Sequence, residues 1–265
     1  MPSETETAPI LRDKAHGSAS AFTPENLLRE ARRQRGLGAS RLPPLCVLDP
    51  DGDIVRHLCK TARARPDPDW ACYHSVLHRF EEAGRTIGIV GCAVGAPYAV
   101  LVAEQMFAAG CELLISITSS GQIKALRPPP YFILIDAALR DEGTSYHYLP
   151  PSEFVQAPAD LIAAVATAFA GVGEPVERGA TWTTDAPYRE TEQAIAAARA
   201  RGILAVEMEA AALYAFAQAR CKAVLCFAHV TNQMGQAGDF EKGEANGATA
   251  ALRLIDAVAT AWFTV

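Results

Sequence analysis

The feature that most constrains the fold is a repeated unit. In each copy an apolar, β-rich run is followed by a Gly-containing turn and a longer Ala-rich run. One copy joins a strand at 86–91 to a helix at 97–110 and a second strand at 112–118. This β–α–β pattern indicates parallel strands under helices, because parallel strands need a crossover connection. Apolar runs at 131–139 and 222–230 add further strands. We therefore expect an α/β protein, a three-layer α/β/α sandwich around a mixed, mostly parallel sheet.

The N-terminal part of the chain differs from the rest. Residues 1–20 are rich in Ser, Thr, Ala and Glu without periodicity, which predicts a flexible tail. Residues 24–35 predict a basic amphipathic helix, since Thr23 can cap it and Gly36 can end it. We expect this helix to serve as an arm or a subunit contact. No internal linker is evident, so residues 21–265 are expected to form one domain.

Composition narrows the range of partners. The chain has 265 residues, half of them hydrophobic, which is enough for a large core. The net charge of −6 disfavours a nucleic-acid binder or an anionic-membrane binder, because phosphate contacts need a basic face. It leaves room for a local anion site. The sequence shows no signal peptide and no apolar run of spanning length, so we expect a soluble, cytoplasmic protein.

Cysteine and histidine spacing bears on redox state and metals. The seven cysteines are an odd count without CxxC spacing and several lie in apolar runs, which indicates reduced, mostly buried thiols. The six histidines show no metal-site spacing, and His74 with His78 lacks an obvious carboxylate third ligand. We therefore expect no metal. His229, alone in an apolar strand, is interpreted as a satisfied core residue.

Two Gly- and Ser-rich turns lie at strand exits, where α/β sheets bind ligands. In the turn at 91–97, Gly95 lets backbone N–H groups approach an anion at a helix start. At the next exit, Ser119, Ser120 and Gly121 offer two hydroxyls and a bare backbone, which suit phosphate or ribose oxygens. Each pattern by itself is equally typical of an ordinary turn.

Two further strand exits carry groups that can recognise a sugar and a base. Glu207 and Glu209 flank Met208 directly before an apolar helix; a carboxylate can hold a vicinal diol, and Met can pack on a sugar face. Acidic residues at a helix start are also common partners of the helix dipole. At the last exit Asn232 can donate and accept, which fits a base or amide edge, but it cannot deliver a proton.

Taken in order, these four segments resemble the nucleoside phosphorylase superfamily, and especially uridine phosphorylases. The resemblance runs from about Leu45 to the C-terminus. CAVGAP is similar to the family's GxGGP turn, ITSSG to its GTxG loop and VEMEAAALY to its EMExAAL segment. Likewise ALRDEGTSYHYLPP is similar to DGxSxHF, WTTDAPYRET to the base-site loop, and VTN to the VN of uridine phosphorylases, where purine enzymes carry Ser-Asp.

The resemblance implies cleavage of a nucleoside's N-glycosidic bond, with phosphate attacking C1′ and no cofactor. The expected reaction is phosphorolysis of uridine or a related pyrimidine nucleoside by a homo-oligomer. By matched position, Glu209 would hold the ribose hydroxyls, with Met208 lining the sugar and Glu207 alongside. Ser119 and the turn around Gly95 would face phosphate. A pyrimidine base would meet these three residues: Arg189, Gln193 and Asn232. Asp141 and His147 lie in the matched stretch and Asp185 in the TTDAP loop, but we assign a catalytic role to none of them.

Two positions depart from the family pattern. In LDPDG (48–52), Gly52 stands where a phosphate-binding Arg is expected, and Ser116 stands at the place of a second Arg. Each missing Arg removes charge-assisted bonds worth about 1.5–3 kcal/mol. The sequence offers four cations as substitutes: Arg56, Lys60, Arg79 and Arg140. Two alternatives stay open: a hydrolytic nucleosidase with water as nucleophile, and a non-catalytic nucleoside-binding relative.

Overall fold

A computed structural model describes residues 8–234 and 240–264, so residues 1–7 of the predicted tail lie outside the described part. The strands are β1 Leu45–Asp49, β2 Ala64–Pro66, β3 Leu77–Glu82, β4 Arg85–Gly91, β5 Leu113–Gln122, β6 Tyr131–Asp141, β7 Phe154–Gln156, β8 Val176–Thr184, β9 Ala205–Glu207 and β10 Ala223–Gln233. The helices are α1 Pro24–Arg35, α2 Asp53–Lys60, α3 Ala96–Ala108, α4 Ala159–Val165, α5 Glu192–Ala200, α6 Ala210–Arg220 and α7 Ala248–Thr264.

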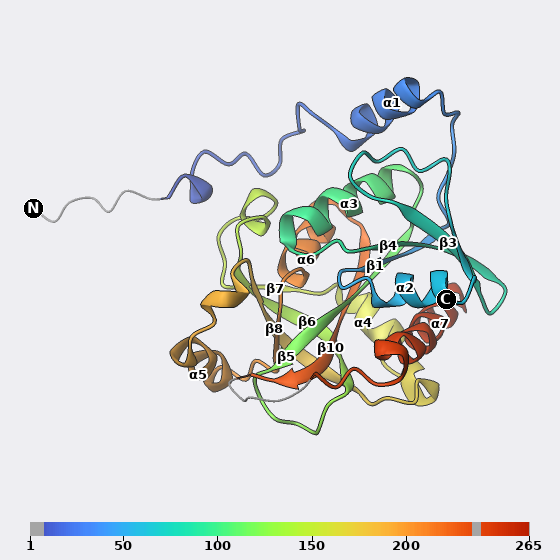
Figure 1. Ribbon diagram of the computed structural model, residues 1–265. Helices are drawn as coiled ribbons and strands as arrows, with labels where there is room; N and C mark the ends of the chain where they lie inside the picture. Colours follow the sequence, from blue (N-terminus) through green and yellow to red (C-terminus); the bar gives the residue numbers. More distant parts are fainter. Residues whose placement is uncertain (1–7, 235–239, 265) are drawn as a thin grey trace, which may run out of the picture.

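The sheet is mixed and lies between two layers of helices, as the sequence predicts. Helices α3 and α6 cover one face, and α2, α4 and α7 cover the other (Figure 1). The predicted β–α–β unit is β4–α3–β5, and its two strands both pair in parallel with β1, which lies between them. Antiparallel β3 and β2 extend the sheet beyond β4.

One half of the sheet closes on itself. Strand β5 pairs with β10 on one side and β9 on the other, and the pairs β9–β8, β8–β6 and β6–β10 complete a ring. The apolar runs predict β5, β6 and β10 but not β8, β9 or this closure, since the contacts join segments far apart in the sequence. Three of the predicted site segments, which follow or end β5, β9 and β10, therefore lie on one hydrogen-bonded ring.

The N-terminal segment packs on the outside of the domain. Helix α1 begins at Pro24 after the cap residue Thr23, whose Oγ1 accepts from the Asn26 amide, and it ends at Gly36 in a left-handed conformation. Its buried face contacts α3. Before it, within the predicted tail, His16 contacts the Tyr146 carbonyl and Ser20 accepts a hydrogen bond from Arg220.

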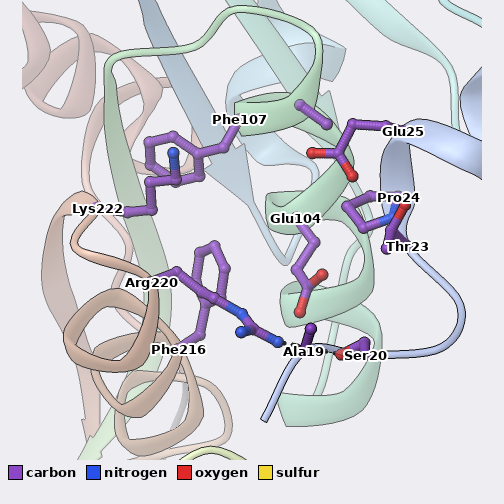
Figure 2. A pocket seen from close by; sticks show the side chains of 11 residues that line it. Ala19, Ser20, Thr23, Pro24, Glu25, Glu104, Phe107, Phe216, Arg220 and Lys222 are labelled. Atoms are coloured by element: carbon purple, nitrogen blue, oxygen red, sulfur yellow. Dashed lines mark hydrogen bonds between the residues drawn. The ribbon is translucent and has the colours of Figure 1, made fainter. Parts of the chain in front are cut away.

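A cavity of about 370 Å³ lies under this N-terminal segment. Glu104 and Phe107 from the second half of α3 line it, together with Phe216, Arg220 and Lys222 from the end of α6 and the start of β10 (Figure 2). The second half of α3, the end of α6 and the start of β10 lie at the edge of the sheet opposite to the carboxyl ends of its parallel strands. At 1.5 Å per residue, a helix of the length of α3 separates the two ends by roughly 20 Å. The cavity is therefore separate from the predicted site.

Two general features complete the fold. No helix in the described ranges is long and apolar enough to cross a membrane. All seven cysteines carry free thiols, four of them buried and three exposed.

Candidate active site

The segment Glu207–Glu209 connects β9 to α6 and places two carboxyl groups with different environments. Glu207 is 3% exposed, and its Oε1 accepts hydrogen bonds from the Thr181 and Thr183 hydroxyls. Its Oε2 accepts from the backbone N–H groups of Glu209 and Ala210, both at 2.7 Å, at the N-terminus of α6. Both oxygens are thus committed to the protein's own chain. The geometry indicates that Glu207 positions the backbone of Glu209. The resemblance, in contrast, placed Glu207 beside the substrate.

Glu209 is the carboxyl group that remains for a ligand. It is 1% exposed; its Oε1 accepts from the Gly95 N–H at 2.7 Å, and its Oε2 accepts from the Met208 N–H at 3.3 Å. Gly95 has φ 89°, a conformation that favours glycine, and it precedes α3. The Thr118 side chain also lies against the Glu209 carboxyl group. The structure therefore brings together three of the predicted segments at one carboxyl group. Met208 lies beside it and is half-buried.

Burial changes the protonation of this site. It raises the pKa of Asp49, at the end of β1, to about 7. Burial, with the neighbouring charge of Glu207, raises the pKa of Glu209 to about 8. Both values exceed the value of about 4 for carboxyl groups in an unfolded chain. The folded protein thus binds more protons than the unfolded chain between about pH 4 and pH 8, and the free energy of unfolding should fall as the pH rises through that window.

A substitution tests this pH dependence. Asp49→Asn removes one of the two groups, so the fall in the free energy of unfolding should become less steep between about pH 5 and pH 7. Urea denaturation of the wild type and the variant at a series of pH values measures the two slopes. Equal slopes would mean that Asp49 carries no proton in the folded protein.

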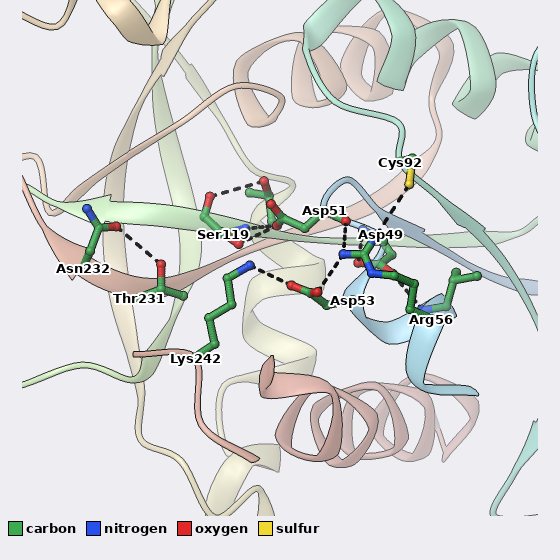
Figure 3. Close-up of polar contacts among 12 residues, drawn as sticks. Asp49, Asp51, Asp53, Arg56, Cys92, Ser119, Thr231, Asn232 and Lys242 are labelled. Atoms are coloured by element: carbon green, nitrogen blue, oxygen red, sulfur yellow. Dashed lines mark hydrogen bonds and ion pairs between the residues drawn. The ribbon is translucent and has the colours of Figure 1, made fainter. Parts of the chain in front are cut away.

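Ser119, expected to face phosphate, contacts a carboxylate of the protein itself. Its backbone N–H and its Oγ both donate to Oδ2 of Asp51, each at 2.6 Å (Figure 3). Asp51 lies in the turn between β1 and α2, within the LDPDG segment. Sequence reasoning noted that segment for its missing Arg and overlooked Asp51. Ser120, the next residue, has a buried Oγ without a hydrogen-bond partner among the described residues.

Two cations lie next to this turn, and both contact one carboxylate. Asp53, the first residue of α2, accepts from Arg56 at 2.7 Å and from Lys242 at 2.7 Å (Figure 3). Arg56 was one of the four predicted substitutes. Lys242 was missed, because it follows β10 by several residues and matches no motif. The other substitutes serve elsewhere: Arg79 pairs with Asp67, Arg140 binds the 145–152 loop, and Lys60 is exposed at the end of α2.

The structure explains why Gly52 cannot simply be an arginine. Gly52 has φ 75°, and a Cβ atom there would lie 2.7 Å from the Cys92 Sγ and 2.8 Å from the Arg56 Nη1. The Arg56 guanidinium thus occupies the space beside Gly52. At the second departure, the Ser116 Oγ is buried and has no hydrogen-bond partner among the described residues.

The predicted base-recognition residues divide into two groups. Asn232 lies in β10 directly beside Gly121 of β5, after a local register shift. The Met234 side chain covers Gly121, where a Cβ would lie only 2.1 Å from Sδ. In contrast, Arg189 and Gln193 are exposed, and neither side chain forms a hydrogen bond within the described part of the chain. The structure therefore joins Asn232 to the Ser119–Gly121 strand and leaves Arg189 and Gln193 outside this cluster.

Three polar residues near the site have structural partners. Asp141 accepts from the Trp182 indole N–H, and Asp185 accepts from the Gly143 N–H. His229 contacts Glu174 and stacks on Phe132, with ring centroids 4.6 Å apart. The interpretation of His229 as a satisfied core residue is confirmed.

With the fold and the site described, comparisons with known proteins define the class. Residues 44–260 match the Phosphorylase superfamily, and the chain belongs to that family. The predicted resemblance is confirmed. Uridine phosphorylase from Thermococcus kodakarensis is 26% identical over 62% of this chain and 66% of its own length. Guanosine phosphorylase from Halorubrum lacusprofundi is 27% identical over 51% of this chain and 56% of its own length.

Solved structures agree on the fold. The crystal structure of uridine phosphorylase from Vibrio fischeri matches 86% of this chain and 95% of its own, with a TM-score of 0.70 and 18% identity. The predicted α/β fold with a mixed sheet is thereby confirmed. The chain spans less than two thirds of the length of both sequence relatives, so these matches establish family and fold, and the substrate has to be argued from the site.

Proposed function

We propose that this protein cleaves the N-glycosidic bond of a nucleoside. The observation that carries the proposal is the buried carboxyl group of Glu209, fixed by the Gly95 N–H beside the Ser119 segment. A carboxylate with two oxygens can accept from both hydroxyls of a ribose, and a rigid sugar lets an oxocarbenium-like transition state develop at C1′. Glu207 would fix Glu209, while Met208 would pack on the sugar.

A pyrimidine nucleoside, with uridine first, is the proposed substrate class. Asn232 offers an amide for the base carbonyls, whereas protonating a purine N7 would need an acid at this position. One relative is named a uridine phosphorylase, which supports uridine, and another is named a guanosine phosphorylase. We further propose a cytoplasmic homo-oligomer; exposed Phe22 and Leu101 offer apolar surface for subunit contact.

Two nucleophiles are candidates. Phosphate is supported by the family and by Arg56 and Lys242, which lie beside the Gly52 turn and could bind an oxyanion. Phosphate would yield ribose 1-phosphate and the free base. Water is the second candidate, because the Asp51 carboxylate already holds both donors of Ser119. Water would yield free ribose.

A panel of nucleosides tests the proposal. Uridine, thymidine, inosine and 5′-methylthioadenosine are incubated with the enzyme, with and without phosphate, and chromatography follows the released base. Uridine should be cleaved fastest, and the sugar product identifies the nucleophile. If calorimetry showed uridine binding while no nucleoside released its base under either condition, the chain would be a binding protein and the proposed reaction would be wrong.

A further inference from the structure

Asp51 accepts the two hydrogen-bond donors of Ser119 that the resemblance assigns to phosphate. The Ser119 N–H and Oγ–H converge on a single oxygen, Oδ2 of Asp51, at 2.6 Å each. Two donors that converge in this way are the usual protein ligands of a phosphate oxygen. For phosphate to bind Ser119, it would first have to displace a carboxylate of the same chain.

The surrounding charge opposes that exchange. Asp49, Asp51 and Asp53 lie in one turn, and Asp51 is close enough to Glu209 to raise its pKa. The two nearby cations, Arg56 and Lys242, already neutralise Asp53. A phosphate dianion would have to approach the Asp51 carboxylate while both nearby cations are engaged with Asp53, whereas a water molecule brings no charge.

Among the three aspartates of this turn, only Asp51 has an oxygen to spare. Asp49 is 2% exposed, and both of its oxygens accept backbone N–H groups, from Gly52 and Val55. Asp53 uses one oxygen for Arg56 and the other for Lys242. In Asp51, Oδ2 is held by Ser119, and Oδ1 accepts no hydrogen bond from any described residue. Asp51 is therefore fixed through one oxygen and open at the other.

On the basis of the proposed nucleoside cleavage, we propose that Asp51 is the general base of a hydrolytic reaction, with Ser119 as its positioning residue. A water molecule bound to Oδ1 attacks C1′ and transfers one proton to Asp51. The new C1′–O bond forms as the C1′–N bond breaks. The electron pair of the C1′–N bond leaves with the nucleobase, which takes up a proton from solvent. The products are free ribose and the neutral base, and Asp51 returns its proton to solvent.

The test compares Asp51→Asn with the wild type on uridine in phosphate-free buffer. The wild type should release uracil and free ribose without phosphate, and added phosphate should neither accelerate the reaction nor yield ribose 1-phosphate. Asp51→Asn keeps an acceptor for Ser119 but cannot take a proton, so turnover should fall by at least about 100-fold. Asp69→Asn makes the same change at an exposed site outside this turn and should leave turnover unchanged.

Rescue by azide distinguishes the loss of the general base from damage to the fold. Azide is an anion that attacks C1′ without losing a proton, so it needs no general base. Adding azide to Asp51→Ala should restore uracil release and produce ribosyl azide, which mass spectrometry detects. A merely structural defect would not be rescued, and failure of azide in a variant that still binds uridine would overturn the role of Asp51.

The remaining outcomes separate this inference from the proposed function. Uracil release that requires phosphate and yields ribose 1-phosphate would overturn the hydrolytic reaction while upholding nucleoside cleavage. If the turnover of Asp51→Asn stayed within about threefold of the wild type, the role of Asp51 as general base would be overturned, and nucleoside cleavage would still stand. No release of base from any nucleoside, with or without phosphate, would overturn both proposals.

Discussion

Glu209→Ala should lower kcat/KM for the nucleoside by about 1000-fold. In the proposed reaction the carboxylate accepts from two ribose hydroxyls, and charge-assisted hydrogen bonds are worth about 1.5–3 kcal/mol each. A loss of about 4 kcal/mol in transition-state binding corresponds to this change in rate. Steady-state kinetics at saturating and limiting uridine measure kcat and kcat/KM separately. A loss confined to KM would assign Glu209 to ground-state binding alone.

The pH profile provides an independent check on Glu209. Its pKa of about 8 means that the ionised form, which can accept from both hydroxyls, increases as the pH rises toward 8. The wild-type kcat/KM should rise with pH up to that region and then level off. Glu209→Gln cannot ionise, and its residual activity should lack this rise. The same rise in wild type and Glu209→Gln would contradict the assignment.

Glu207→Ala should lower the free energy of unfolding by at least about 4 kcal/mol. The substitution leaves two buried hydroxyls and two backbone N–H groups without an acceptor, and each unsatisfied group costs about 1–3 kcal/mol. Urea denaturation measures the change. Activity should also fall, because the Glu209 amide loses its anchor.

A matched control separates the effect of the buried hydrogen bonds of Glu207 from the effect of a negative charge near a helix N-terminus. Glu192 also lies in the first turn of a helix, α5, but it is exposed. Glu192→Ala should change the free energy of unfolding by less than about 1 kcal/mol, since only the interaction with the helix dipole is lost. Equal losses at Glu192 and Glu207 would show that the buried hydrogen bonds of Glu207 contribute little.

Local signals made much of the fold predictable. Helix α1 begins and ends at the predicted residues because Thr23, Pro24 and Gly36 act on their immediate neighbours. The β4–α3–β5 unit follows from apolar periodicity, which is also local. The position of Glu209 before α6 could be predicted because its motif is contiguous, so this part of the candidate site needed no knowledge of distant contacts.

The contacts of the turn around Asp51 could not be predicted in the same way. Asp51 and Ser119 are 68 positions apart, and Lys242 and Asp53 are 189 apart. Such pairings depend on strand order and on the path of loops, which periodicity does not report. The motif predicts that Arg189 and Gln193 meet the base, and both are exposed, Arg189 before α5 and Gln193 in its first turn, so their role stays a prediction.

The closed ring of β5, β9, β8, β6 and β10 supports one half of the candidate site. The residues proposed to hold the sugar lie on or directly after strands of this ring, each of which is hydrogen-bonded to a neighbour on both sides. The turn that carries Asp51 lies after β1, outside the ring, and is joined to it through the hydrogen bonds from Ser119 to Asp51. The group proposed to activate the nucleophile and the groups proposed to hold the sugar are therefore supported by different parts of the sheet.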